Sequence, residues 1–125
     1  MQTRQIPKSE WPAFLDRFSR QHGGSLVKLE ILGSEIGAQV SESGLALEGL
    51  TDEWDEMNGS AIIITAGNTP DHHITHSINL PKEISLEQTD EGADVALSIK
   101  ANDATTALLT FCDAVAPETG EVPAA

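Results

Sequence analysis

The sequence predicts an α+β fold: one N-terminal helix on a meandering antiparallel sheet of six to eight short strands, strongly curved or closed as a small barrel. Three observations lead to this prediction. One stretch near the N-terminus has apolar residues at helical spacing. From residue 25 onward the spacing changes to every second residue, with Gly, Asn, Asp and Ser between the runs. No helical pattern separates these runs, so a parallel nucleotide-binding sheet is not expected.

The predicted helix begins at Ser9, a residue type that favours the N-cap position, and ends before Gly23 and Gly24. Its apolar stripe has the spacing i, i+3, i+4, i+7 and consists of Trp11, Phe14, Leu15 and Phe18. Cationic side chains follow near the C-terminus, where they favour the helix dipole: Arg17, Arg20 and His22. We expect the stripe to pack on the sheet or at a barrel end; a helix that binds a partner groove is the alternative.

Residues 61–80 are predicted to form the central hairpin of the sheet. Three consecutive isoleucines in residues 61–66 favour a strand that is covered on both faces. Residues 67–70 form a turn, and residues 71–80 alternate, so one set of side chains faces the core. That inward set is His72, Ile74, His76, Ile78 and Leu80.

The remaining alternating runs predict six more short strands, at residues 26–32, 36–41, 45–50, 83–88, 95–100 and 105–112. Ser43 and Gly44 are expected to form a turn between two of them. The segment 51–59 breaks the alternation, and Thr51 is a candidate cap for a single helical turn. We therefore expect one α+β domain at residues 1–112 and a disordered acidic tail at residues 113–125.

The charge balance of this 125-residue chain excludes several partners. Twenty acidic residues oppose seven basic ones, giving a net charge of −13. Direct binding to nucleic acid or to anionic membranes needs an excess of Lys and Arg, so neither is expected. Cys112 is the single cysteine, which excludes an internal disulfide. No apolar run approaches a membrane span of about 20 residues and no secretory signal begins the chain, so a cytoplasmic location is expected.

The motif DHHITH contains three of the four histidines and suggests a metal site. In a strand, however, His72 and His76 lie about 13 Å apart on one face, at roughly 3.3 Å per residue, and His73 lies on the other face. One ion with bonds near 2 Å does not reach such a pair. We therefore predict no metal and no cofactor, with His76 half-buried and hydrogen-bonded and His73 in solvent. A pH-sensitive or ligand-contacting role is the alternative.

An acidic, aromatic patch is predicted at residues 52–56, where four carboxylates flank a tryptophan: Asp52, Glu53, Trp54, Asp55 and Glu56. The spacing does not fit an EF-hand calcium loop. Such a patch favours a basic partner. The alternative is a solvated loop whose tryptophan folds back on the sheet.

No catalytic constellation is found in the sequence. Cys112 lies in no nucleophile motif, and no P-loop, G-x-G-x-x-G or G-x-S-x-G pattern occurs. We expect a small non-enzymatic module that binds a protein or small ligand, with a homodimer as one form. One alternative is a ligand-binding protein or enzyme whose pocket joins His73 or His76 to the helix end, at Arg17, Arg20 or His22. The other is an acidic regulator of a nucleic-acid-binding protein.

Five blocks carry a family pattern: RQIPKSEWPAFLDRFSRQHGG, LVKLEILGSEIGAQ, DHHITHSI, LEQTDEGADVALSI and TTALLTF. Together they resemble the uncharacterised bacterial domain-of-unknown-function family 5335, over most of residues 4–111. The first block is the most specific, with an Ile–Pro pair, Trp11 and then FLxxFSRxH ending at His22. Gly24 and Ser25 stand where the family often has an aromatic residue. The resemblance implies a cytosolic bacterial protein and brings no catalytic residues.

Overall fold

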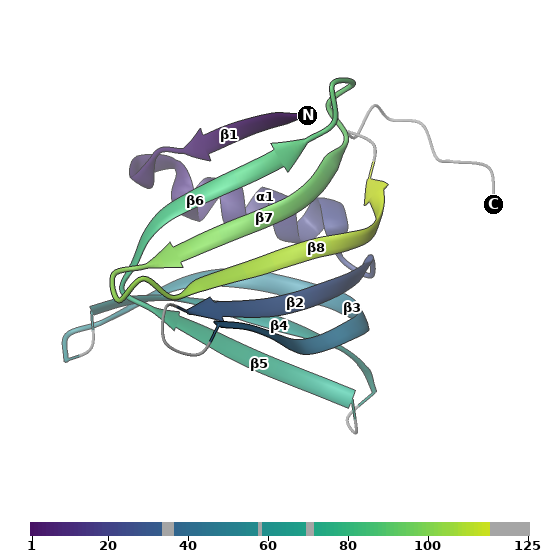
Figure 1. Cartoon of the computed structure of the whole chain (residues 1–125). Helices are drawn as coiled ribbons and strands as arrows, with labels where there is room; N and C mark the ends of the chain where they lie inside the picture. The colour runs from purple at the N-terminus through teal and green to yellow at the C-terminus, as the bar shows by residue number, and fades with distance from the viewer. Residues whose placement is uncertain (34–36, 58, 70–71, 116–125) are drawn as a thin grey trace.

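One helix and eight strands make up the described part of the chain (Figure 1). The computed structural model describes residues 1–33, 37–57, 59–69 and 72–115, without the side chains of residues 37–42, 68, 69, 72 and 113–115. The helix is α1, Trp11–His22. The strands are β1 (Gln2–Ile6), β2 (Leu26–Gly33), β3 (Gly37–Asp55), β4 (Gly59–Thr69), β5 (His72–Asn79), β6 (Pro81–Gln88), β7 (Asp94–Ala101) and β8 (Thr106–Val115). The predicted α+β class is confirmed.

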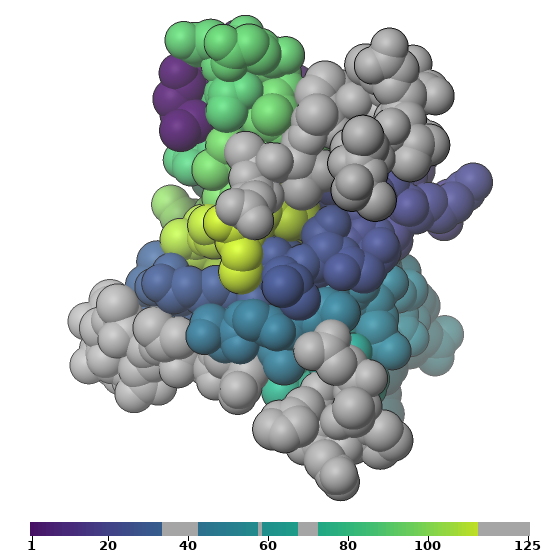
Figure 2. Space-filling model, turned by 90° about the vertical axis from the view of Figure 1, so that its right-hand side faces the viewer, coloured from purple at the N-terminus to yellow at the C-terminus, as the bar shows by residue number. Residues whose placement is uncertain are grey.

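All eight strands belong to one antiparallel sheet with the order β1-β6-β7-β8-β2-β3-β4-β5. Figure 2 shows β8, β2 and β3 next to one another on one face of the molecule. The sheet is open and not strongly curled, with β1 and β5 as its edges, so the predicted barrel is not supported. The hairpin formed by β4 and β5 exists as predicted, but it lies at an edge of the sheet and not at its centre.

Leu80 joins the two ends of the sheet at one corner. It alone links edge strand β5 to β6, the neighbour of the opposite edge strand, and its φ of 53° lies in the left-handed region. Its N–H donates to the carbonyl of Ser60 at 2.9 Å, and its own carbonyl accepts from the N–H of Asn102 at 2.9 Å. The sheet therefore bends at this corner without closing.

The core lies on the face of the sheet that α1 covers. Alternate residues of the strands are buried there, and the large side chains among them include Val27, Leu29, Leu47, Ile62, Ile64, Ile84, Leu97, Ile99 and Leu109. Ile63 lies between two of them on the strand and is only half-buried. The isoleucine run is therefore covered on one face only, contrary to prediction, because no second layer packs on the other side of β4 among the described residues (Figure 1).

The apolar stripe of α1 is buried as predicted, and the helix begins later than predicted. A 3₁₀ turn at Lys8–Glu10 precedes it, so Glu10 and not Ser9 occupies the N-cap position. The N–H of Glu10 donates to the carbonyl of Pro7 at 2.9 Å in that turn, and no side chain caps the helix. Trp11 fixes the start of the helix, since its Nε1–H donates to the carbonyl of Ile6 at the end of β1 at 2.9 Å.

Two predicted breaks are absent because β3 is a single long strand. Ser43 pairs with Lys28 and Leu45 pairs with Val27, which leaves Gly44 as the extra residue of a bulge. Gly44 has a φ of 71°, a conformation that glycine adopts in bulges as well as in turns. The predicted turn at this position is therefore wrong. The predicted helical turn from Thr51 is also wrong, because β3 continues to Asp55 and pairs with β4.

The two ends of the chain differ from the expectations in smaller ways. The first strand, β1, was not predicted; it is polar apart from Ile6, which is its one buried residue. The last strand, β8, extends to Val115, and residues 116–125 of the predicted tail lie outside the described residues. In the described part of the chain, no helix has the length and apolar character needed to cross a membrane.

Candidate functional site

The end of the β3–β4 hairpin exposes large apolar side chains beside carboxylates. We call this region the hairpin tip and define it by Glu53, Trp54, Asp55, Glu56 and Met57, all of which are exposed. Trp54 is 71% exposed and Met57 is 91% exposed. The Met57 N–H donates to Oδ1 of Asp55 at 2.7 Å, which holds the turn. The predicted acidic, aromatic patch is thus largely at the surface, and its tryptophan does not fold back on the sheet.

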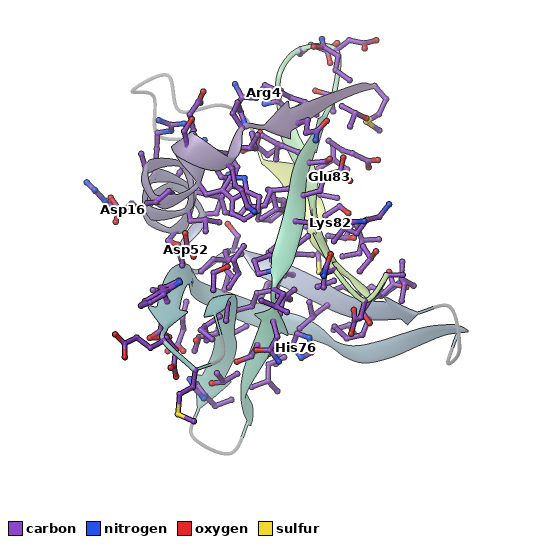
Figure 3. All side chains as sticks on the ribbon, turned by 90° about the vertical axis from the view of Figure 1, so that its left-hand side faces the viewer. Arg4, Asp16, Asp52, His76, Lys82 and Glu83 are labelled. Atoms are coloured by element: carbon purple, nitrogen blue, oxygen red, sulfur yellow. The ribbon has the colours of Figure 1, made fainter. Side chains whose placement is uncertain are left out.

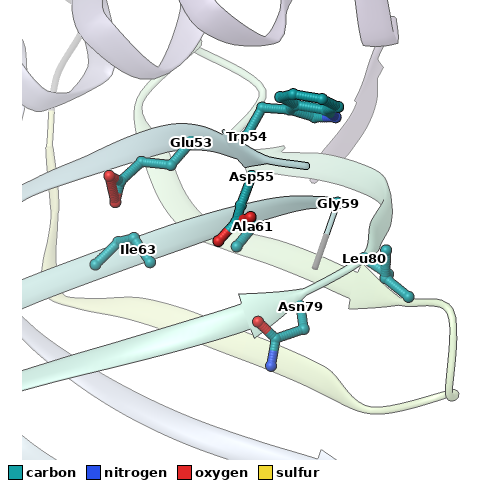
Figure 4. Close-up of a pocket in the computed structure, with 8 residues that line it drawn as sticks. All are labelled: Glu53, Trp54, Asp55, Gly59, Ala61, Ile63, Asn79 and Leu80. Carbon is teal, nitrogen blue, oxygen red and sulfur yellow. The ribbon is translucent and has the colours of Figure 1, made fainter. Parts of the chain in front are cut away.

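A pocket of about 670 Å³ adjoins the hairpin tip (Figure 4). Its lining combines Glu53, Trp54 and Asp55 with Gly59, Ala61, Ile63, Asn79 and Leu80. Glu53, Ala61 and Asn79 are register partners across three strands, so they form one row on the outer face of the sheet. Figure 4 shows the carboxylates of Glu53 and Asp55 on the opposite side of the strand from the Trp54 indole.

Gly59 is required at the edge of this pocket. Its φ is 79°, and a Cβ at this position would lie 2.9 Å from Cδ2 of Leu80. A side chain here would therefore be strained and would also displace Leu80 from the pocket wall. The sequence showed Gly59 only as the end of an irregular segment, and the left-handed conformation became visible only in the structure.

Asp52 differs from the other acidic residues of the predicted patch. It pairs in register with buried Ile62, so its side chain points to the face that carries α1. Burial raises the pKa of the Asp52 carboxyl. It lines a separate pocket of about 370 Å³ between the helix and β3, which also includes Ser19 and Glu48. The patch is therefore divided between the two faces of the sheet.

The histidine-bearing segment is extended, as predicted. His76 pairs in register with buried Ile64 and is half-buried, and burial lowers its pKa (Figure 3). No hydrogen-bond partner of His76 is seen among the described residues, and the expected bond stays a prediction. His73 is exposed on the other face, and its Nε2 lies 2.6 Å from Oε2 of Glu48. The register partner of His73 on β4 is Gly67. The side chain of His72 lies outside the described residues.

His22, at the C-terminal end of α1, is fully buried and paired. Its Nε2 lies 2.6 Å from Oδ2 of Asp94. The centroid of its ring lies 4.5 Å from the ring centroid of Phe18 and 4.6 Å from that of Phe111. The other ring nitrogen, Nδ1, is buried without a partner among the described residues. His22 is therefore part of the packing between the helix and the sheet.

Asp94 stays ionised in this buried position. Burial alone raises the pKa of its carboxyl, but hydrogen bonds from His22 and Gln88, together with the charges of His22 and Arg4, outweigh burial and lower the pKa. The Gln88 amide donates to Oδ1 at 2.9 Å, so both carboxylate oxygens have partners. A buried charge is tolerated when it is paired in this way.

The described residues do not bring the predicted ligand-binding residues into one pocket. Arg17 lines a pocket between α1 and β6–β7, and Arg20 forms an exposed ion pair with Asp16 one helical turn earlier. Arg17 and Arg20 also line a shallow pocket on the helix surface. None of these pockets includes His73 or His76. Within the described residues, no three His, Cys, Asp or Glu side chains gather as a cation site.

Sequence reasoning missed the two polar contacts that hold α1 on the sheet, which we call the two anchors. One is the pair formed by His22 and Asp94. In the other, the Ser19 hydroxyl accepts from the N–H of Leu50 at 2.8 Å and donates to its carbonyl at 3.1 Å. The anchors connect α1 to opposite halves of the sheet, at β7 and at β3. Both lie in the block FSRQH, where the unusual mixture of Ser and His on a buried helix face was the available signal.

Comparison with known proteins adds a family and one relative. The sequence profile of a family described as "Family of unknown function (DUF5335)" matches residues 2–119. A protein of Aquifex aeolicus (strain VF5), named "Uncharacterized protein", is 36% identical over 91 residues, which cover 72% of this chain and 75% of the relative. No solved structure matches the chain. Because the profile spans nearly the whole chain, the protein belongs to the family of unknown function DUF5335.

Proposed function

We propose that this protein is a small non-enzymatic binding module, and that the hairpin tip holds a short basic segment of a partner protein. The observation that carries the proposal is the exposure of Trp54 and Met57 at a hairpin end that also carries three carboxylates and adjoins a pocket. Aromatic residues and methionine are enriched in protein interfaces, and the exposed side chains of Trp54 and Met57 contribute little to the core.

The chemistry of the pocket favours Lys or Arg side chains that alternate with apolar ones. Ala61 and Ile63 provide an apolar floor for an alkyl stem, and Glu53 and Asp55 provide carboxylates for its charged end. Trp54 offers a ring face to a second cation or to an apolar side chain. A standard interface between folded proteins buries roughly 800 Å² per partner and about 20–30 residues a side. The hairpin tip consists of five residues, so we propose a short segment as its partner and not a folded domain.

The placement of other residues supports this proposal over the two alternatives. For a ligand-binding or catalytic pocket between the helix end and the histidine strand, His73 or His76 would have to share a pocket with the helix end. The pockets lined by Arg17 or Arg20 include neither histidine, and His22 is buried against Asp94. For an acidic regulator of a nucleic-acid-binding protein, we would expect a row of carboxylates. The exposed acidic residues instead lie on the helix, at the hairpin tip and in separate turns, as Asp16, Glu53, Glu91 and Asp103 illustrate.

Calorimetric titration with a synthetic peptide of alternating lysine and leucine tests the proposal. The native chain should bind this peptide, and added salt should weaken binding because exposed charges are screened over about 8 Å at physiological ionic strength. Trp54→Ala should weaken binding about tenfold or more, the effect expected of an interface hot spot. The double variant Glu53→Gln/Asp55→Asn should also weaken it.

The matched control is Asp90→Asn/Glu91→Gln, which removes two exposed charges from the turn between β6 and β7. It changes the net charge by the same amount as the hairpin double variant and should leave binding nearly unchanged. A peptide of alternating glutamate and leucine should not bind. If the two double variants lost the same amount of affinity for the peptide, binding would depend on total charge alone. The proposed site would then be wrong.

A further inference from the structure

A second pocket, of about 360 Å³, lies between α1 and the strands β1, β6 and β7. Its apolar wall consists of Phe14 and Phe18 from the helix and Leu86 from β6. Arg4 from β1 and Arg17 from α1 line the same pocket, together with Gln21. Three elements that are separate in the sequence thus bring two guanidinium groups to one apolar hollow, and Figure 3 shows Arg4 on the side of β1 that faces the helix.

These two arginines differ from the other cations in the N-terminal half of the chain. The others already have a partner: Lys8 lies over the Trp11 ring, Arg20 pairs with Asp16, and Lys28 pairs with Glu30. In the described part of the chain, no carboxylate lies within ion-pair distance of Arg4 or Arg17. With a net charge of −13, this chain has many carboxylates that could have paired with them.

The one carboxylate in the pocket, Asp94, neutralises the two arginines only in part, although the charge of Arg4 lowers its pKa. Both oxygens of Asp94 accept hydrogen bonds from other groups, namely His22 and Gln88. With Arg4 and Arg17 counted as positive and Asp94 as negative, the lining keeps an excess of one positive charge. Guanidinium groups bind carboxylate and phosphate through paired N–H donors, so an anionic group is the complementary ligand.

We infer that the pocket between α1 and β1, β6 and β7 is a binding site for a small organic anion, in which Arg4 and Arg17 hold a carboxylate or phosphate group. The apolar body of the ligand lies against Phe14, Phe18 and Leu86. The site is separate from the hairpin tip and takes a ligand of opposite charge. A negative result for this site would therefore not affect the proposed peptide-binding function, and the reverse also holds.

Titration of the ¹⁵N-labelled protein with benzoate and with phenyl phosphate tests this inference. Saturable shifts are expected at the amides of Gln21 and Gly92, which line the pocket, at ligand concentrations up to about 10 mM, the weak end of specific binding. The ligand with the lower dissociation constant identifies the preferred anionic group. Benzyl alcohol, which has the same ring without the charge, should give no saturable shifts at these amides.

Arg4→Gln and Arg17→Gln should each weaken binding about tenfold, and the double variant should abolish it. Arg20→Gln is the matched control, since Arg20 lies on the same helix and is paired with Asp16 outside this pocket. All three side chains are exposed, so the fold should persist, and the spectrum of each variant reports this directly. The inference is overturned if no saturable shifts occur, or if Arg20→Gln weakens binding as much as Arg17→Gln does.

Discussion

The two tryptophans of this chain have opposite environments. Trp11 is 3% exposed, and its indole N–H is bonded to the carbonyl of Ile6. Trp54 is 71% exposed, at the end of the longest strand. The first belongs to a helix that is held on the sheet by apolar packing and by the two anchors. The second lies at the end of β3, next to a turn, and its exposed side chain contributes little to that packing. The comparison separates the surface that folds the chain from the surface that we propose binds a partner.

The largest expected effect comes from removing the buried indole. Trp11→Ala should lower the free energy of unfolding by about 4 kcal/mol, since truncation of a buried aromatic residue loses both burial and packing. Urea unfolding followed by circular dichroism measures this loss. Trp11→Phe should cost less, because the ring volume is largely kept and only the bond to the Ile6 carbonyl is lost. If Trp11→Ala lost as little stability as Trp54→Ala, the proposed difference between the two tryptophans would be wrong.

The anchor at β7 should give the next largest effect. Asp94→Asn removes the charged partner of buried His22 and should lower the free energy of unfolding by about 3 kcal/mol at pH 7. The folded state lowers the pKa of Asp94 below its ordinary 3.8, so the pair stabilises the fold above that pH and is lost as the pH falls further. The difference between the native chain and the variant should therefore shrink below pH 3.8. A pH-independent difference would contradict this assignment.

The anchor at β3 is weaker, because it consists of neutral hydrogen bonds at a half-buried site. Ser19→Ala should lower the free energy of unfolding by about 1 kcal/mol, since the backbone groups of Leu50 lose their partner. Ser9→Ala is the control, because Ser9 makes no capping bond in the 3₁₀ turn. Thermal unfolding of both variants in parallel should show a decrease for the first and almost none for the second.

His76 should produce a smaller effect that depends on pH. Burial lowers its pKa below the ordinary 6.5, so protonation favours the unfolded chain. The stability of the native chain should therefore decrease as the pH falls through 6.5, and His76→Gln should remove this part of the decrease. His73→Gln tests the opposite face of the same strand, where the imidazole is exposed beside Glu48. If His73→Gln, and not His76→Gln, removed the pH dependence of the stability, the assignment of this effect to His76 would be wrong.

The smallest effect on folding is expected at the hairpin tip. Trp54→Ala should change the free energy of unfolding by no more than about 0.5 kcal/mol, as is usual for exposed positions. The same variant should show one of the largest losses of peptide binding. Urea unfolding and calorimetry on one preparation give both values. A destabilisation of several kcal/mol would mean that Trp54 supports the fold, and loss of binding could no longer be assigned to the surface.

The sequence predicted what depends on local spacing. The stripe from Trp11 to Phe18 follows the helical period, and the alternation in residues 71–80 places His73 and His76 on opposite faces, as the structure has them. The sequence also led to a turn at Gly44, because a left-handed glycine serves turns and bulges alike. Only the pairing with β2 distinguishes the two cases.

Contacts between distant residues could not be predicted in this way. His22 and Asp94 are 72 positions apart, and no periodicity relates a helix end to the start of a strand near the other end of the chain. The convergence of Arg4 and Arg17 on one pocket also depends on the pairing of β1 with β6. The polar sequence of the N-terminus gave no indication that β1 is a strand. The acidic patch was visible in the sequence, and its division between two faces was not.

The two indole N–H signals in the ¹⁵N spectrum provide the most direct measurement of the proposed division between folding and binding surfaces. During titration with the lysine–leucine peptide, the Trp54 indole signal should shift and saturate with the amides of Gly59 and Asn79, which line the same pocket. The Trp11 indole signal should stay in place, because its N–H remains bonded inside the core. A shift of the Trp11 signal with an unchanged Trp54 signal would contradict the account.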